Sequence, residues 1–132
     1  NQTIKFCRTN GFVKTIFGRK VHLRGINDKN FSVRSFQERA AINAPIQGSA
    51  ADIIRLAMIK INQKKIDDKK FEAKMLLQIH DELIFETNIK NKKYSMSNIT
   101  EIMESVASSE FYKFSIPLEV NVNSGYNWGE AN

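Results

Sequence analysis

The sequence predicts an α+β fold, because its two halves have different patterns of apolar residues. The second half reads as strand, strand, helix and strand, whereas the first half is mainly helical with one hairpin. An apolar hairpin followed by an amphipathic helix suits a small antiparallel sheet with one covered face. With 132 residues and 42% hydrophobic content, the chain can bury one core and by its length counts as one domain.

The chain is expected to open with a helix and a surface hairpin. Residues 1–10 look like the last part of a helix that ends at Gly11. Residues 12–17 and 20–23 flank Gly18 and the basic residue Arg19, which indicates two short strands joined by a basic loop. Residues 25–30 are then expected to form a loop.

Residues 32–65 are helical in character, with a break predicted at residues 45–48. Pro45 has no backbone donor, and it disfavours helix for the residue before it. We therefore expect a shorter helix, a break and a longer helix. Five apolar residues of the longer helix recur at core-facing spacing: Ala50, Ile53, Ile54, Ala57 and Ile61.

A polar ribbon occupies another face of this helical stretch and consists of Ser35, Arg39, Asn43 and Gln47, which recur every fourth residue. It is bordered by small residues, which let another backbone come close: Ala40, Ala41, Ala44 and Gly48. Arginine, asparagine and glutamine can donate to phosphates and to the acceptors of a DNA minor groove. A simple solvated helix face is an equally valid interpretation of the spacing alone.

The most unusual stretch is the predicted hairpin over residues 74–86, KMLLQIHDELIFE. Met75, Leu77 and Ile79 alternate with other residues before the tip, and the alternation resumes after it. The tip is His80-Asp81-Glu82 and contains no glycine, although short hairpin turns favour glycine. Such exceptions to local turn chemistry tend to fall at functional or strained sites.

Two interpretations of Asp81 and Glu82 are open from the residues alone. Acidic residues are common in solvated turns. Carboxylates at the end of a stiff apolar hairpin can also hold hard cations such as Mg²⁺ against phosphate oxygens. A metal site for phosphoryl transfer is the sharper hypothesis.

The last part of the chain is expected to form a helix and a strand. Residues 64–74 and 88–97 look like polar connections, and Asn98 is a candidate helix N-cap with Glu101 three residues later. Apolar residues then follow at helical spacing: Ile99, Ile102, Met103 and Val106. Pro117 is expected to open a strand in which Leu118, Val120 and Val122 alternate with polar residues.

Charge and cysteine content narrow the class of partner. The net charge of +6 and a pI near 9.5 favour polyanionic partners such as nucleic acid. Cys7 is the single cysteine, which excludes an internal disulfide framework, and with only His22 and His80 it offers no zinc set.

No apolar run approaches the length needed to span a membrane, so no membrane partner is expected. Since the chain starts at Asn1, we expect a longer precursor.

Four blocks of the chain, in this order, closely resemble the C-terminal part of family A, Pol I-like DNA polymerases. They are GFVKTIFGRKVHL at residues 11–23, RAAINAPIQGSAADIIRLAMI at 39–59, LLQIHDELIFE at 76–86 and SGYNWGEA at 124–131. The resemblance implies a right-hand fold, of which this chain would be the last helices of the fingers and the C-terminal half of the palm. Residues 1–65 would form the fingers/palm junction, and residues 66–132 the palm with the catalytic hairpin.

The resemblance also implies roles for individual residues. Asp81 would be a catalytic ligand of Mg²⁺, Glu82 the adjacent and less critical acid, and His80 a residue near the primer terminus. The three long side chains of the polar ribbon would contact template and primer in the minor groove: Arg39, Asn43 and Gln47. The other metal-binding aspartate of the family has no counterpart here, so the two-metal site would be completed from outside this chain.

The function implied by the resemblance is template-directed DNA synthesis by a larger polypeptide. The partners would be primer-template DNA, dNTP and the rest of the polymerase polypeptide. The alternative is that the isolated chain is a non-catalytic DNA-binding module. An exposed sheet edge is also expected to favour a dimer of the isolated chain.

The source is predicted from composition and resemblance together. The chain is rich in Lys, Asn and Ile and prefers Lys to Arg, a bias expected from an AT-rich genome. We therefore expect an organellar enzyme similar to the apicoplast DNA polymerase of apicomplexan parasites. A bacterial enzyme of the same family, in the cytoplasm, is the alternative.

Overall fold

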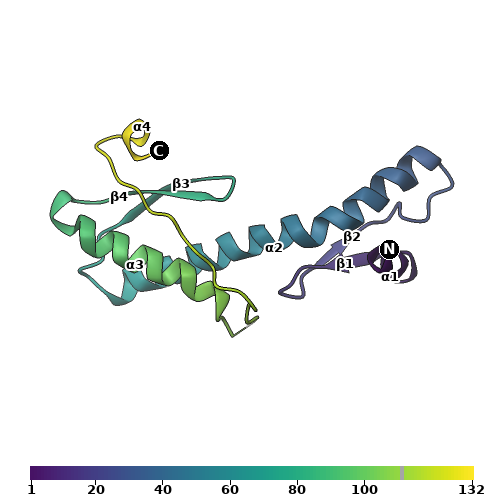
Figure 1. The fold of residues 1–132 in the computed structure, drawn as a ribbon, viewed down its shortest axis with the longest axis horizontal. Coiled ribbons are helices and arrows are strands. Elements are labelled where there is room, and N and C mark those ends of the chain that lie inside the picture. The colour runs from purple at the N-terminus through teal and green to yellow at the C-terminus, as the bar shows by residue number, and fades with distance from the viewer. Residues whose placement is uncertain (111) are drawn as a thin grey trace. The chain divides into compact units, whose positions relative to one another are not determined.

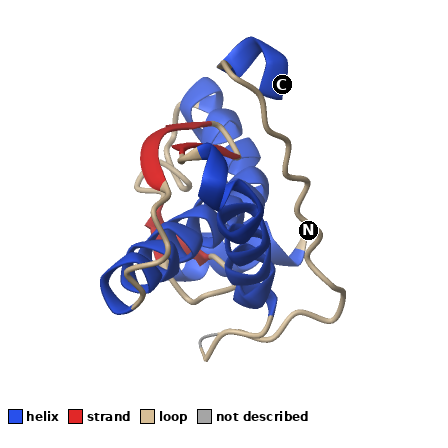
Figure 2. Ribbon diagram, turned by 90° about the vertical axis from the view of Figure 1, so that its left-hand side faces the viewer, coloured by secondary structure: helices blue, strands red, loops and turns tan. Residues whose placement is uncertain are grey.

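The computed structural model describes residues 1–110 and 112–132. It divides the chain into two compact units, residues 1–53 and 54–132, and the boundary falls inside the long helix α2 (Phe31–Asp67). Helices make up most of the described chain, and its strands form antiparallel hairpins (Figures 1 and 2). The predicted α+β class is confirmed. The functional division predicted at residues 65 and 66 stays a prediction.

Unit 1 begins with the predicted helix and hairpin. Helix α1 (Gln2–Asn10) is capped by Asn1, whose side chain accepts the amide of Thr3 at 2.9 Å. It ends at Gly11, whose φ of 78° is a left-handed conformation that glycine adopts without strain. Strands β1 (Phe12–Lys14) and β2 (Lys20–His22) then pair antiparallel, as predicted.

The core of unit 1 lies between the hairpin and the first half of α2. Its buried members are Cys7, Val13, Leu23, Ile26 and Ala41. Val21, Ala40 and Ala44 pack against this cluster. The helix starts after Asn30, whose side chain accepts the amide of Ser32 at 2.9 Å, as an N-cap does.

The predicted break near Pro45 is wrong, because α2 runs without interruption from Phe31 to Asp67. Pro45 cannot donate to the carbonyl of Ala41, but this loss affects a single helical bond. The turn that follows is held by another part of the chain. The Ser49 hydroxyl donates to the Pro45 carbonyl and accepts the backbone amide of Ile16 at 2.9 Å. These bonds hold the helix together across the proline.

The predicted core stripe of α2 is right in its second part and wrong at its start. Ile54, Ala57 and Ile61 are buried, and Ile53 is half-buried. Ala50 is exposed instead. The buried positions in that turn belong to Ser49 and Asp52, and Asp52 forms an ion pair with Arg19.

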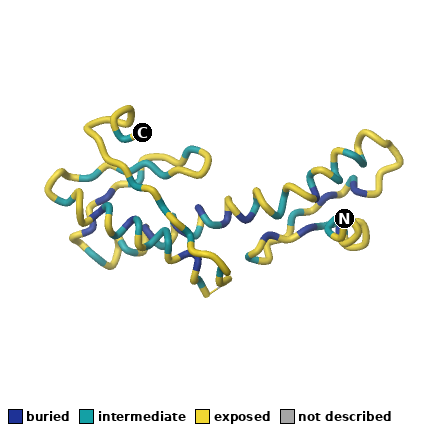
Figure 3. The backbone as a smooth tube through the Cα atoms, in the orientation of Figure 1, coloured by how far each residue is buried: buried dark blue, intermediate teal, exposed yellow. Residues whose placement is uncertain are grey.

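Unit 2 is built on the predicted hairpin of β3 (Lys74–Ile79) and β4 (Glu82–Glu86). One face of the hairpin packs against the end of α2 and against α3 (Lys92–Glu104), where the buried positions of this unit gather (Figure 3). The buried residues of this cluster are Ile61, Phe71, Ala73 and Ile99. Met75, Leu83, Phe85, Ile102 and Met103 pack around them.

The predicted polar loop over residues 88–97 and the predicted N-cap at Asn98 are both wrong. A short 3-10 helix, η1 (Ile89–Asn91), leads directly into α3 at Lys92. Asn98 lies inside α3 and donates its side-chain amide to the carbonyl of Tyr94 at 2.8 Å. Ser95 is the one buried residue of this segment, and its hydroxyl lies 3.0 Å from that of Thr87.

The last predicted strand is only half right. Leu118, Val120 and Val122 are half-buried and alternate with exposed residues, yet residues 117–123 form no strand. The amide of Val120 donates instead to the carboxylate of Glu104 at 3.1 Å. A strand needs a ladder partner, and the described residues provide none for this segment.

Helix α3 is extended by the 3-10 helix η2 (Ser105–Ala107). The last element of the chain is α4 (Trp128–Ala131), which follows residues 117–123. Asn127 caps α4 by accepting the amide of Glu130 at 3.0 Å. In the part of the chain that the structure describes, no helix is both long and apolar enough to cross a membrane.

Candidate functional site

The tip of the β3–β4 hairpin is a two-residue turn made of His80 and Asp81. Ile79 pairs directly with Glu82 across the strands, so the turn has no other members. His80 has a φ of 51° and is the one non-glycine residue with a positive φ in the described part of the chain. The amide of the Gln78 side chain donates to the His80 carbonyl at 3.3 Å and braces the turn. The sequence-based expectation of a strained turn is therefore met.

A β-bulge in β3 changes which apolar residues face the core. Met75 pairs with Phe85 and Leu77 pairs with Ile84, which leaves Leu76 as the extra residue. Met75 and Leu77 therefore do not share a face, although they alternate in the sequence. Met75 joins the core cluster, whereas Leu77 is on the opposite face with Ile84 and is 45% exposed.

The two acids at the tip have the donor chemistry of a Mg²⁺ site but do not complete one. Asp81 and Glu82 are both exposed, and their carboxylate oxygens are ligands that hard cations prefer. Among residues 1–110 and 112–132, no group of three or more potential ligands lies close enough to hold a metal ion. The two acids therefore fit such an ion only as part of a ligand set.

The polar ribbon of α2 faces outward in unit 1. Arg39, Asn43 and Gln47 are exposed, and the Arg39 guanidinium donates to the Ser35 hydroxyl at 2.8 Å. The apolar residues beside the ribbon are exposed as well: Ile42 at 40% and Ile46 at 70%. The ribbon is thus the polar part of an exposed face of α2 that also contains apolar residues. The opposite side of the helix packs on the core of unit 1.

The small residues that border the ribbon pack against other side chains of unit 1. Ala40, Ala41 and Ala44 pack in or against the core of unit 1. A Cβ atom added to Gly48 would lie 2.8 Å from the Cγ2 of Thr15, in the loop between β1 and β2. These positions are small because the hairpin approaches the helix there.

The predicted site residues form two groups. His80, Asp81 and Glu82 are consecutive at the hairpin tip in unit 2. Arg39, Asn43 and Gln47 share one helix in unit 1. The structure therefore brings together the members of each group, and the two groups belong to different units.

The sequence-based interpretation missed a set of contacts that we call the loop clasp. It joins Thr15, Ile16 and Arg19 of the β1–β2 loop to Gly48, Ser49 and Asp52 of α2. The basic loop was visible in the sequence, and Asp52 lies outside the predicted apolar stripe of the helix. No pattern, however, pairs residues so far apart along the chain.

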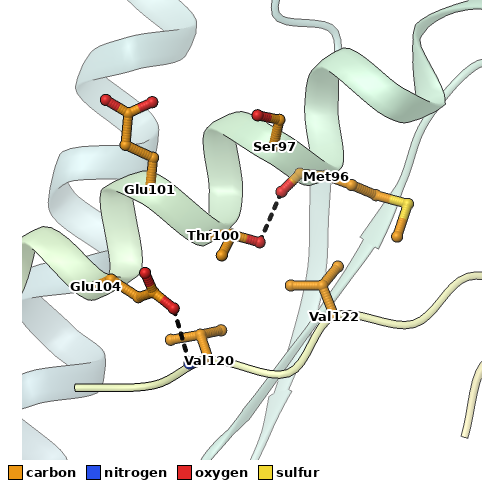
Figure 4. Close-up of a pocket in the computed structure, with 7 residues that line it drawn as sticks. All are labelled: Met96, Ser97, Thr100, Glu101, Glu104, Val120 and Val122. Atoms are coloured by element: carbon orange, nitrogen blue, oxygen red, sulfur yellow. Dashed lines mark hydrogen bonds between the residues drawn. The ribbon is translucent and has the colours of Figure 1, made fainter. Parts of the chain in front are cut away.

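Unit 2 also contains a shallow groove between α3 and residues 117–123 (Figure 4). Its volume is about 510 Å³. It is lined by Met96, Ser97, Thr100, Glu101, Glu104, Val120 and Val122. Figure 4 shows the bond from the Val120 amide to Glu104, which fastens the segment along one side of the helix.

A second polar contact in unit 2 ties the end of α2 to the start of α3. The Tyr94 hydroxyl donates to Asp68, and Lys64 lies 3.2 Å from the same carboxylate oxygen. The bond from Tyr94, followed by the amide of Lys70, lowers the pKa of Asp68 to about 2. The same contact with Asp68 raises the pKa of Tyr94 and of Lys64.

Comparisons with known proteins agree on one family. The family model described as DNA polymerase family A matches residues 1–130. DNA polymerase I of Rhizobium leguminosarum is 47% identical over 125 residues, which cover 94% of this chain and 12% of that protein. DNA polymerase I of Caldicellulosiruptor bescii is 42% identical over 131 residues, which cover 99% of this chain and 15% of that protein.

A solved structure gives the same result for the fold. The POL domain of Pol1 from M. smegmatis, in complex with DNA primer-template and dNTP, matches with a TM-score of 0.88 and 39% sequence identity. The match covers 98% of this chain and 22% of that chain. The predicted polymerase fold is confirmed, and the chain spans only a small part of the relatives that it matches.

Proposed function

Because the chain belongs to DNA polymerase family A, we propose that it is part of a larger polypeptide that extends a DNA primer on a template. The substrates would be primer-template DNA and dNTP, both of which are bound in the structure of the M. smegmatis POL domain. The observation that carries the proposal is the braced hairpin tip without glycine, where Asp81 lies in the turn and Glu82 opens β4. Asp81 and Glu82 would be the catalytic acids of this chain.

The acids at the tip would act through a bound divalent cation. Mg²⁺ held by Asp81, with Glu82 beside it and an aspartate from elsewhere in the polypeptide, would supply Lewis acidity for the attack of the primer 3′-hydroxyl on the triphosphate. The contribution of this chain would be to hold Asp81 on a two-residue turn and Glu82 at the start of β4. His80, the first turn residue, would lie near the primer terminus.

The polar ribbon would bind the newly formed duplex. Arg39, Asn43 and Gln47 can donate to the minor-groove acceptors, which have similar positions in every correct base pair. The ribbon would therefore sense the geometry of a pair rather than its sequence. A mismatched primer end displaces those acceptors, so the next addition would be slower.

The second candidate function concerns the chain in isolation. Its net charge of +6 and the incomplete ligand set both favour a DNA-binding module without catalysis. The hairpin edges of β3 and β4 would be exposed in the isolated chain, which favours a dimer through strand pairing. Binding that weakens with salt and yields no extended primer is the result expected from the isolated chain.

The source is best assigned from the relatives. The polymerases matched here come from bacteria, which favours the bacterial cytoplasm over an apicoplast as the location of the protein. The Lys-, Asn- and Ile-rich composition fits an AT-rich genome of either kind.

Primer extension tests the proposal directly. The full-length polypeptide that carries this chain is incubated with a labelled primer-template, all four dNTPs and Mg²⁺, in parallel with the isolated chain. Extension by the full-length protein alone is the expected result. A full-length protein that binds the DNA but never extends the primer would leave only the binding function.

A further inference from the structure

Asp52 of the loop clasp lies on the side of α2 opposite Asn43 of the polar ribbon. Asp52 follows Asn43 by nine positions, or about two and a half helical turns at 3.6 residues per turn. The two side chains therefore project from opposite sides of the helix. This agrees with their burial, since Asp52 is 7% exposed and Asn43 is exposed.

The clasp has its strongest contact at Arg19. Its Nε lies 2.8 Å from Oδ1 of Asp52, and its Nη2 donates to the carbonyl of Gly48 at 3.3 Å. The second carboxylate oxygen of Asp52 is buried and has no hydrogen-bond partner among the described residues. Arg19 is therefore the group that makes burial of this carboxylate tolerable.

The clasp is also tightly fitted around Gly48. A Cβ atom at this position would lie 2.8 Å from the Thr15 methyl carbon and 3.2 Å from Nη2 of Arg19. Thr15 is itself buried, and its hydroxyl accepts the amide of Arg19 at 3.2 Å. The loop thus rests on the helix backbone next to Gln47.

Pro45 makes the loop clasp important for the position of the ribbon side chains. The missing bond between residues 41 and 45 weakens the helix between Asn43 and Gln47. Without external support, the two side chains could change their relative position by bending of this turn. The clasp holds the helix just C-terminal to the weak turn, through Gly48, Ser49 and Asp52.

We propose that Arg19 and Asp52 are positioning residues that hold Gln47 in register with Asn43 for recognition of the minor groove. The inference rests on the proposed role of the ribbon in the function described above. Arg19 would touch neither primer nor template in this role. Its effect on the discrimination between matched and mismatched primer ends would pass entirely through Gln47.

The test is a double-mutant cycle in the full-length polypeptide, with variants Arg19→Gln, Gln47→Ala and the combination of both. The readout is the ratio of extension rates from matched and mismatched primer ends. We expect Arg19→Gln to lower this ratio by roughly 3- to 10-fold, the range of one lost hydrogen bond. In the Gln47→Ala background, Arg19→Gln should change the ratio no further. Arg34→Gln is the control, because Arg34 bonds to loop carbonyls outside the clasp.

A second pair of variants avoids removal of the buried ion pair. Gly48→Ala should lower the same ratio, although alanine is the better helix former, because its Cβ would displace Thr15. Adding Thr15→Ser deletes the obstructing methyl group and keeps the hydroxyl, so the ratio should recover. Failure of this recovery would contradict the clasp as the cause.

The outcomes separate the inference from the function on which it rests. If Gln47→Ala lowers the ratio and neither Arg19→Gln nor Gly48→Ala does, the positioning role is overturned and the ribbon role stands. If Arg19→Gln and Gln47→Ala have additive effects, Arg19 does not act through Gln47. If Gln47→Ala leaves the ratio unchanged, the minor-groove role of Gln47 is overturned together with the positioning role.

Discussion

Ile79 and Glu82 are paired directly across the β3–β4 hairpin, and this pair leaves His80 and Asp81 alone to reverse the chain. The position of the Asp81 carboxylate is therefore determined by a turn with few degrees of freedom. A glycine would adopt the positive φ of this turn without strain. Because His80 occupies the position instead, the turn carries a cost in backbone strain.

The strain at His80 can be measured by substitution. A left-handed conformation costs a non-glycine residue about 1 kcal/mol or more. His80→Gly should therefore stabilise the hairpin relative to His80→Ala by about 1 kcal/mol, which corresponds to roughly fivefold slower hydrogen exchange of the β3 and β4 amides. Equal exchange in the two variants would show that the turn is unstrained.

The contact between Asp68 and Tyr94 predicts a dependence of stability on pH. The pKa of Asp68 is about 2 in the folded chain and close to 3.9 in an unfolded one. The stabilisation is therefore complete above about pH 4 and is lost as the pH falls toward 2. Asp68→Asn should lower the melting temperature at pH 7 and make no difference near pH 2. Asp67→Asn is the matched control and should change neither value.

The same contact has a counterpart at alkaline pH. The pKa values of Tyr94 and Lys64 are raised, so their contributions are present below the ordinary pKa of each group and are lost as the pH rises through the folded value. Tyr94→Phe should reproduce part of the loss of stability of Asp68→Asn at pH 7, because Lys64 and the Lys70 amide still contact Asp68. If Tyr94→Phe melts like the wild type at pH 7, the hydroxyl does not stabilise the junction of α2 and α3.

The role of the polar ribbon predicts a loss of discrimination rather than a loss of synthesis. Gln47→Ala should extend mismatched primer ends with a smaller penalty, and the ratio of matched to mismatched extension should fall roughly 3- to 10-fold. Gln63→Ala is the control, since Gln63 is an exposed glutamine of the same helix that bonds only to Asp67 among the described residues. An equal fall in the two variants would contradict the minor-groove assignment.

The elements that could be predicted from the sequence are those defined by local patterns. The hairpin of residues 74–86 follows from its alternation, and the outward face of Arg39, Asn43 and Gln47 follows from spacing along one helix. The bulge at Leu76 could not be predicted in this way, because the apolar pattern of the strand continues across it.

The remaining errors have causes that lie elsewhere in the chain. The helix continues through Pro45 because Ile16 and Arg19, far away in sequence, bind the following turn. Similarly, α3 starts before the predicted N-cap and includes Ser95, which is buried against Thr87. The strand predicted after Pro117 has the correct alternation, but sheet formation requires a partner strand that its own sequence cannot specify.

The central claim is that Asp81 is a catalytic metal ligand, and its removal is the most direct measurement. Primer extension with Mg²⁺ and DNA binding are compared for the full-length polypeptide, Asp81→Ala and the control Asp67→Ala, which removes an exposed acid at the end of α2. We predict that Asp81→Ala lowers the extension rate by a factor on the order of 10³ and leaves DNA binding nearly unchanged, while the control behaves like the wild type. Extension by Asp81→Ala at the wild-type rate would contradict the account.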